Sequence, residues 1–325
     1  MAKTINYLQA MVTAQMEEMR RDPNVIIWGE DIGKFGGTFQ ATAGILAEFG
    51  PERIWDFPLS ENAMGSMAVG AALYGKRMVV DMMFGDFMSL YFQSIVNEAA
   101  KMRFVTNATA TCPIVFTAAH GIGAGIGVHH SQSTESWALN APGVKIVCPS
   151  TPRDALGLFK AAIRDNNPVV FLQHKALYGD KQEIEEVDDF ILPIGKAEVV
   201  QEGKDVTLLA NQLMRKFALA AIPELEKQGI SVELIDPRTI KPFDKETVCK
   251  SVKKTGRCAI VHECCLTGGY GAEFAAQIQD VCLGELKKPI KRIAYDNSIP
   301  AGAEESYAIP STQDIIKGVT EIVKG

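Results

Sequence analysis

The sequence lacks the long apolar runs and the positive charge that mark several classes of protein. Its longest apolar stretches, such as residues 67–73, fall well short of the roughly 20 residues that a membrane-spanning helix needs, so we expect no membrane contact. Lysine and arginine total 33 against 39 aspartate and glutamate residues, and this balance gives no support for nucleic-acid binding. The N-terminal residues contain no apolar signal region, so we expect a cytoplasmic protein of bacterial type.

Several binding motifs are also missing. The seven cysteines are odd in number and contain no C-x-x-C pair, which predicts small buried side chains rather than disulfides. The sequence contains no P-loop, no G-x-G-x-x-G and no H-E-x-x-H motif. The grouping of Cys258, His262 and Cys264 matches the spacing of no common zinc site. These absences argue against the commonest nucleotide- and zinc-binding classes.

The pattern of apolar residues predicts an α/β fold. A chain of 325 residues with 47% hydrophobic and 22% charged residues has ordinary globular composition and a length typical of two domains. Short apolar runs alternate with amphipathic stretches, which favours a parallel sheet covered on both faces. The runs are residues 25–28, 78–84, 113–116, 144–147 and 169–172, and the helical stretches are 5–21, 60–73, 90–104 and the segment that begins at Thr151-Pro152.

A change in composition separates a second, smaller domain. Residues 180–189 are rich in charge and precede Pro193, so we interpret residues 176–196 as an interdomain connection. A second α/β series follows, with strands expected at 206–209, 232–235, 259–262 and 290–294 and helices at 212–227 and 311–323. The predicted domains are residues 1–185 and 195–325.

Acidic residues are the strongest candidates for chemistry. Glu30 directly follows a buried strand, and Glu61 opens a helix made almost wholly of Ala, Gly, Met and Val. A desolvated carboxyl has a raised pKa and suits proton transfer, whereas a carboxylate at a helix start is also stabilised by the macrodipole alone. Position leaves both interpretations open. Asp81 and Asp86 lie near the end of another strand, where parallel sheets usually bind ligands.

The segment from His120 to Gly127 has glycine at every second position. This spacing does not fit a dinucleotide-binding motif. It predicts either a mobile loop or a turn in which the backbone approaches another group closely.

Five stretches, in the same order and spread along nearly the whole chain, resemble a known family. They are WGEDIGKFGG, FPLSENAMGSMAVGAALYGKRMVVDMMFGDFM, GVHHSQSTESWALNAPGVKIVCPSTPRDALGLFKAAIRDNNPVVF, ELIDPRTIKPFDKETV and VHECCLTGGYGAEFAAQI. The family is that of the beta subunits of thiamine-diphosphate-dependent 2-oxo acid dehydrogenases, which act on pyruvate, branched-chain 2-oxo acids or acetoin. The resemblance implies a pyrimidine-binding domain followed by a transketolase-like C-terminal domain.

The resemblance also assigns expected roles. Glu61 matches the glutamate that shares a proton with N1′ of the cofactor's aminopyrimidine, and this proton promotes loss of the thiazolium C2 proton. Phe87 matches the aromatic residue that packs on that ring, and Leu59 is expected to line the same pocket. His130 matches the active-site histidine that transfers protons when the lipoyl group is acylated. Glu30 matches an acidic residue proposed to carry protons between two active sites.

A potassium site and a partner chain are further implications. The family's structural K⁺ is held mostly by backbone carbonyls at positions that match Ile114, Ala162, Asp165 and Asn167. Diphosphate and Mg²⁺ are held in this family by a G-D-G motif, but this chain has only Gly85-Asp86-Phe87. An alpha subunit is therefore expected to supply that half of the site, in an assembly of two alpha and two beta chains.

The expected activity is that of an oxidoreductase. It decarboxylates pyruvate or a branched-chain 2-oxo acid and reductively acylates lipoyl groups of an acyltransferase core. The alternatives are an acetoin-cleaving enzyme and a self-contained transketolase-like carboligase. Residues 299–307 depart from the family's proline- and aromatic-rich pattern, which leaves the docking of the acyltransferase open.

Overall fold

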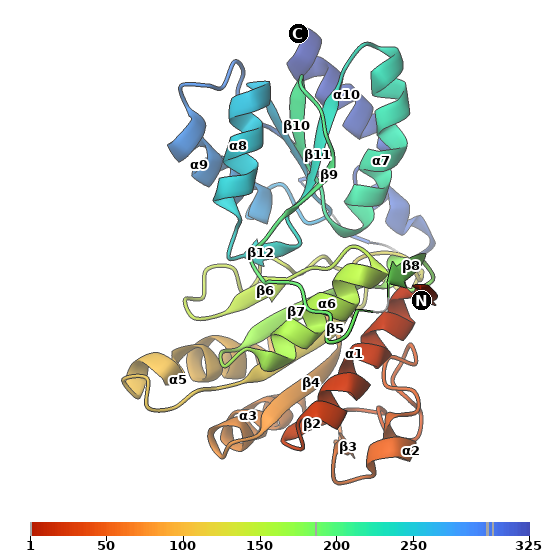
Figure 1. The fold of residues 1–325 in the computed structure, drawn as a ribbon, viewed down its shortest axis with the longest axis vertical. Helices are drawn as coiled ribbons and strands as arrows, with labels where there is room; N and C mark the ends of the chain where they lie inside the picture. Colours follow the sequence, from red (N-terminus) through yellow and green to blue (C-terminus); the bar gives the residue numbers. More distant parts are fainter. Residues whose placement is uncertain (1, 186, 297–298, 301) are drawn as a thin grey trace. The chain divides into compact units, whose positions relative to one another are not determined.

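The computed structural model describes residues 2–185, 187–296, 299–300 and 302–325 (Figure 1). The chain divides into two compact units. One comprises residues 1–120 and 137–194, and the other comprises residues 121–136 and 195–325. The segment 121–136 thus groups with the second unit, although the sequence-based division places it within residues 1–185.

The first unit is built on a parallel sheet with the strand order β6-β7-β5-β4-β2-β3. Strands β5 and β7 are buried along their whole length, as continuous apolar runs predict for a sheet covered on both faces. The predicted α/β fold is confirmed. The strands are β2 (Val25–Gly29), β3 (Ile54–Asp56), β4 (Arg77–Phe84), β5 (Ile114–His120), β6 (Lys145–Val147) and β7 (Val169–His174).

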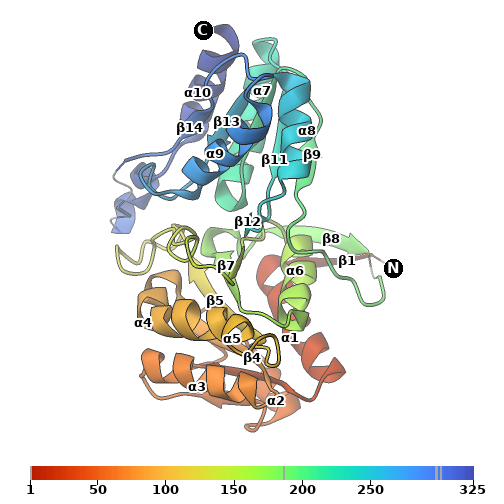
Figure 2. The same cartoon turned by 90° about the vertical axis from the view of Figure 1, so that its left-hand side faces the viewer.

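Helices cover both faces of this sheet (Figures 1 and 2). α1 and α6 pack together on one face, and α3 packs with α4 and the π-helical segment η2 on the other. As predicted, α6 begins with a Thr151 cap, whose hydroxyl accepts from the backbone N–H of Asp154. The helical elements are α1 (Tyr7–Arg21), α2 (Ile45–Phe49), α3 (Glu61–Leu73), η1 (Gly85–Phe87), α4 (Met88–Phe92), η2 (Gln93–Ala99), α5 (Ala100–Val105), α6 (Pro152–Arg164) and η3 (Lys175–Leu177).

A two-stranded antiparallel pair corrects two predictions. β1 (Ala2–Asn6) pairs with β8 (Lys181–Glu185), so the chain is extended where residue 5 was expected to be helical and where residues 176–196 were expected only to connect domains. The charged residues of β8 hid its strand character, but Ile5 and Ile184 are both buried. Asn6 ends β1 and caps α1, because its side chain accepts from the N–H of Gln9 at 2.7 Å.

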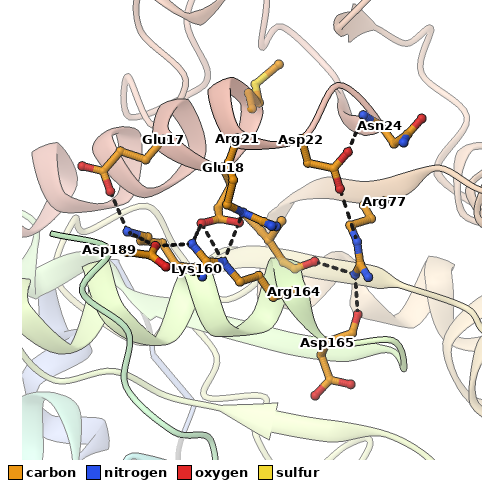
Figure 3. A network of polar contacts seen from close by, with 12 residues as sticks. Glu17, Glu18, Arg21, Asp22, Asn24, Arg77, Lys160, Arg164, Asp165 and Asp189 are labelled. Carbon is orange, nitrogen blue, oxygen red and sulfur yellow. Dashed lines mark hydrogen bonds and ion pairs between the residues drawn. The ribbon is translucent and has the colours of Figure 1, made fainter.

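Charged side chains join α1 to α6 (Figure 3). The carboxylate of Glu18 has no exposed surface, and it accepts hydrogen bonds from Arg164 at 2.5 and 2.9 Å and from Arg21 at 2.8 Å. Arg164 also binds Asp189, and this hydrogen bond is the main reason why the pKa of Asp189 is lowered. The network therefore attaches the segment after β8 to the two helices.

The second unit contains a five-stranded sheet with the order β14-β13-β10-β11-β9, in which β9 alone runs antiparallel to its neighbour among these strands. α7 packs with α10, and α8 packs with α9 (Figure 1). Nowhere in the described ranges is a helix both long enough and apolar enough to cross a membrane. The elements are β9 (Glu198–Gln201), β10 (Val206–Leu209), α7 (Gln212–Lys227), β11 (Val232–Asp236), β12 (Thr239–Lys241), α8 (Lys245–Thr255), β13 (Cys258–Val261), α9 (Tyr270–Cys282), β14 (Lys291–Ile293), η4 (Gly302–Ala308) and α10 (Thr312–Lys324).

Candidate active site

Two of the predicted site residues meet at the carboxyl end of β2. Glu30 directly follows this strand and is buried, and Glu61 is the first residue of α3. The backbone N–H of Ser60 donates to Glu30 Oε1 at 3.4 Å, which attaches the start of α3 to the end of β2. Burial, followed by the negative charge of Glu61, raises the pKa of Glu30. Both effects make ionisation of Glu30 less favourable.

Asp81 brings a third carboxyl to the same strand ends. It lies on β4 opposite Gly29, where a Cβ on residue 29 would come within 3.0 Å of the Asp81 Cβ. Loss of solvent raises the pKa of Asp81 to about 6, although the N–H of Met83 donates to its Oδ1 at 2.9 Å and opposes this shift. A glycine at the end of β2 thus permits close approach of the acidic groups.

Tyr91 lies among these carboxyls, and the sequence reasoning missed it. Its side chain is buried in α4, and its pKa is raised first by burial and then by the charges of Glu30, Asp81 and Glu61. The charges of all three carboxyls therefore act on the pKa of one phenol. Its position four residues after Phe87, on the same side of a helix, was the available signal.

Small residues in α3 bring it against the helix that carries Tyr91. A Cβ on Gly65 would lie 2.7 Å from Ser94 Oγ and 3.0 Å from a ring carbon of Tyr91. The hydroxyls of Ser66 and Ser94 are 3.1 Å apart, so the contact is also polar. Any larger residue at position 65 would separate the first turn of α3 from the tyrosine.

Aromatic side chains follow Asp81 along the chain, at the end of β4 and in η1. Phe87 is half-buried in η1 and packs edge-on against Phe84, with ring centroids 5.6 Å apart. Phe84 makes a similar contact with Phe39 at 5.9 Å. Leu59 is 84% exposed just before α3.

This arrangement fits the ring end of thiamine diphosphate and not its phosphate end. A half-buried carboxyl at Glu61 and an aromatic face at Phe87 suit a protonated heterocycle. In the part of the chain that the structure describes, no lysine or arginine forms an ion pair with Glu30, Glu61 or Asp81. A diphosphate placed here would face negative charge.

His130 belongs to the second unit, in the loop that follows β5. Its backbone N–H donates to the carbonyl of Gly127 at 3.2 Å, and its side chain is half-buried, whereas that of His129 is exposed. His130 therefore lies in the second unit, whereas Glu30, Glu61 and Phe87 lie in the first.

A buried glutamate follows this loop and was not identified from the sequence. Burial raises the pKa of Glu135 to about 8, and the charge of Glu263 adds to the shift. Within the described residues, Glu135 Oε2 has no hydrogen-bond partner. Glu135 is accordingly protonated at neutral pH, and such a group is visible only once the fold is known.

The four residues of the expected potassium site lie around the end of α6 and the start of β5. The carbonyl of Asp165 accepts from Arg77 at 3.0 Å, and that of Ala162 accepts from the N–H of Asp165 at 3.2 Å (Figure 3). The carboxylate of Asp165 pairs with Lys145 and accepts from the N–H of Asn167. Carbonyls at the end of a helix favour a cation, because the macrodipole is negative there.

Comparison with known proteins agrees with this architecture. A model of the transketolase pyrimidine-binding domain matches residues 3–181, and a model of the transketolase C-terminal domain matches residues 195–315. The 2-oxoisovalerate dehydrogenase subunit beta of Bacillus subtilis is 46% identical over 89% of this chain and 89% of its own length. The chain belongs to the family of 2-oxo acid dehydrogenase beta subunits.

Other members of this family are similar over more of the chain. Pyruvate dehydrogenase E1 component beta subunits of Rhizobium meliloti and B. subtilis are 40% and 37% identical, each over 98% of this chain and over 70% and 98% of their own lengths. A solved structure titled a split-gene transketolase, an inactive beta4 tetramer, has a TM-score of 0.78 at 23% identity and covers 98% of both chains. That likeness concerns the fold alone.

Substitution of Glu135 by glutamine should change how stability depends on pH. In the folded chain Glu135 keeps its proton up to about pH 8, whereas the unfolded chain releases it near 4.5. The folded state binds more protons between these values, so the wild-type free energy of unfolding falls as pH rises through this range. Glu135→Gln lacks this penalty, and its stability relative to wild type should increase on the order of a few kcal/mol between pH 5 and 8.5.

Urea unfolding of the full chain at several pH values measures this difference. Glu304→Gln is the control, because Glu304 is exposed in the same unit. A stability difference between wild type and Glu135→Gln that stays constant with pH would contradict the assignment of a protonated Glu135.

Proposed function

We propose that this chain is the beta subunit of a thiamine-diphosphate-dependent 2-oxo acid dehydrogenase. The enzyme decarboxylates pyruvate or a branched-chain 2-oxo acid and reductively acylates lipoyl groups of an acyltransferase partner. The observation that carries this proposal is the group of Glu30, Glu61 and Asp81 around Tyr91, in a member of this family that has no diphosphate motif.

The acidic residues handle protons in this proposal. When bound, thiamine diphosphate would supply the carbon nucleophile for attack on a 2-oxo group. Glu61 holds a proton at N1′ of the aminopyrimidine, and Phe87 orients that ring. Glu30, with its raised pKa, lies near enough to Glu61 to be affected by its charge, and in this proposal it exchanges protons with Glu61. Leu59 closes the side of the pocket toward the partner chain, and His130 transfers a proton to the lipoyl sulfur during acylation.

An alpha subunit is the proposed occupant of the exposed face of α3. The helix is apolar on both sides, although only one side packs against η2 and α4. Met67 is 50% exposed and Tyr74 is 89% exposed, and Leu59 continues the same surface. An apolar helix face of this kind indicates a protein partner. Because this face adjoins Glu61, the alpha chain can bring Mg²⁺ and the diphosphate-binding groups to the other half of the site, in an assembly of two alpha and two beta chains.

A potassium ion is proposed at the end of α6. Its ligands would be carbonyl oxygens among Ile114, Ala162, Asp165 and Asn167. Arg77 already donates to the Asp165 carbonyl, so the ion would share that oxygen and have a structural role.

The alternatives receive less support. A self-contained carboligase needs its own diphosphate-binding residues, and this chain has none of the G-D-G type. The relatives described above are named for 2-oxoisovalerate and pyruvate, which favours a 2-oxo acid over acetoin as the substrate of this chain.

Reconstitution tests the shared active site. The purified chain alone should be inactive, and adding a co-expressed alpha chain, thiamine diphosphate and Mg²⁺ should restore decarboxylation of pyruvate or 3-methyl-2-oxobutanoate with an artificial electron acceptor. Both substrates and acetoin are assayed in parallel. Activity of the chain without any alpha subunit would refute the shared site, and turnover of acetoin alone would favour the alternative.

Glu61→Gln tests the proton role. In the reconstituted enzyme, exchange of the cofactor's C2 hydrogen, followed by NMR, should slow by about 100-fold or more because the N1′ proton is lost. The exposed Glu52→Gln is the control and should leave exchange unchanged. An unaltered rate in Glu61→Gln, with wild-type thermal stability, would remove Glu61 from the mechanism.

Met67→Glu tests the interface. A charge on the exposed face of α3 should weaken binding of the alpha chain by at least about tenfold, because the new carboxylate would be desolvated in the complex. Size-exclusion chromatography and titration calorimetry measure the association. Leu219→Glu is the control, since Leu219 is an equally exposed apolar residue on α7 of the second unit. Equal affinity for both variants would place the alpha chain elsewhere.

A further inference from the structure

The glycine-rich loop of the second unit has a regular backbone. Its four glycines have positive φ angles, while the residues between them do not. Alternation of this kind turns successive backbone N–H groups toward the same side and creates a concave site for an anion. The φ angles are 73° at Gly121, 126° at Gly123, 64° at Gly125 and 88° at Gly127.

Two buried carboxylates from distant parts of the sequence fill this concavity. Glu305 Oε1, on η4, accepts hydrogen bonds from the N–H groups of Gly123 at 2.7 Å and Gly125 at 3.1 Å. Glu263 Oε1, just after β13, accepts from the N–H of Ile122 at 2.8 Å. The side chains of Glu305 and Glu263 are only 9% and 5% exposed.

The loop is the main source of compensation for the charge of Glu305. No lysine or arginine pairs with Glu305 within the described ranges, and its Oε2 has no hydrogen-bond partner there. A buried carboxylate is stable only when donors surround it, and hydrogen bonds to a charged acceptor are stronger than neutral ones. Burial of Glu305 and the conformation of the loop therefore depend on each other.

The same loop contains His130. The N–H of Gly121 donates to the carbonyl of Gln132 at 3.1 Å and closes the loop at its base. Inside this closed segment, the carbonyl of Gly127 accepts from the N–H of His130 at 3.2 Å. Displacement of Gly123 and Gly125 would therefore be transmitted over a few residues to the histidine.

We propose that Glu305 and Glu263 are positioning residues that hold the glycine-rich loop and thereby fix the backbone of His130. The chemical role of His130 comes from the proposed function, but the clamp itself does not depend on it. The clamp selects one conformation of a backbone that glycine would otherwise leave free to adopt many.

Hydrogen exchange on the full-length chain tests the clamp. In Glu305→Ala, exchange of the amides of residues 122–125 should accelerate by at least about tenfold, because two charge-assisted hydrogen bonds are lost. Glu304→Ala is the matched control, since Glu304 is the exposed neighbour on the same 3₁₀ turn. Glu305→Gln retains an acceptor oxygen without the charge and should show an intermediate rate.

The outcomes of this measurement are distinct. Wild-type exchange at residues 122–125 in both Glu305 variants overturns the clamp. If Glu305→Ala loosens the whole second unit, the decision rests on Glu305→Gln, in which faster exchange confined to the loop supports the clamp and an unchanged loop refutes it.

Kinetics of the reconstituted enzyme test the link to His130. Glu305→Ala should lower kcat with little change in the KM of the 2-oxo acid, and the double variant with His130→Ala should be no slower than His130→Ala alone. If the kcat losses of Glu305→Ala and His130→Ala multiply in the double variant, the positioning role is overturned. If His130→Ala retains full activity, the proposed role of the histidine fails, while the exchange experiment still decides whether the clamp exists.

Discussion

The first unit depends on keeping negative charge in a poorly solvated place at the ends of β2 and β4. Gly29 and Gly65 allow two strands and a helix to approach so closely that Glu30, Glu61 and Asp81 interact around Tyr91. Burial and the neighbouring negative charges raise the pKa of Glu30, and burial raises that of Asp81 to about 6. These shifts follow directly from the close packing of the backbone.

Much of this arrangement was accessible from the sequence, since apolar runs and small residues are local signals. The position of Glu30 after a strand and of Glu61 at a helix start singled out two carboxyls that the structure brings close together. What could not be predicted depends on contacts between distant segments. β8 pairs with β1 across about half of the chain, and its charged residues conceal that pairing. Glu135 looks like any other acidic residue until its burial is known.

The surroundings of the buried carboxylates differ between the two units. In the first unit burial, followed by the negative charge of Glu61, raises the pKa of Glu30. In the second, backbone N–H groups of the glycine-rich loop donate to one carboxylate oxygen of Glu263 and one of Glu305. These hydrogen bonds connect two glutamates that are distant in sequence to a single loop.

These electrostatic properties give a physical reason for the proposed division of the active site between two chains. A carboxyl with a raised pKa requires an environment without cations, whereas a diphosphate with Mg²⁺ requires concentrated positive charge. A metal ion close to Glu30 would oppose the rise in pKa that its surroundings cause. If an alpha chain binds the apolar face of α3 as proposed, the two requirements are met on opposite sides of a protein interface.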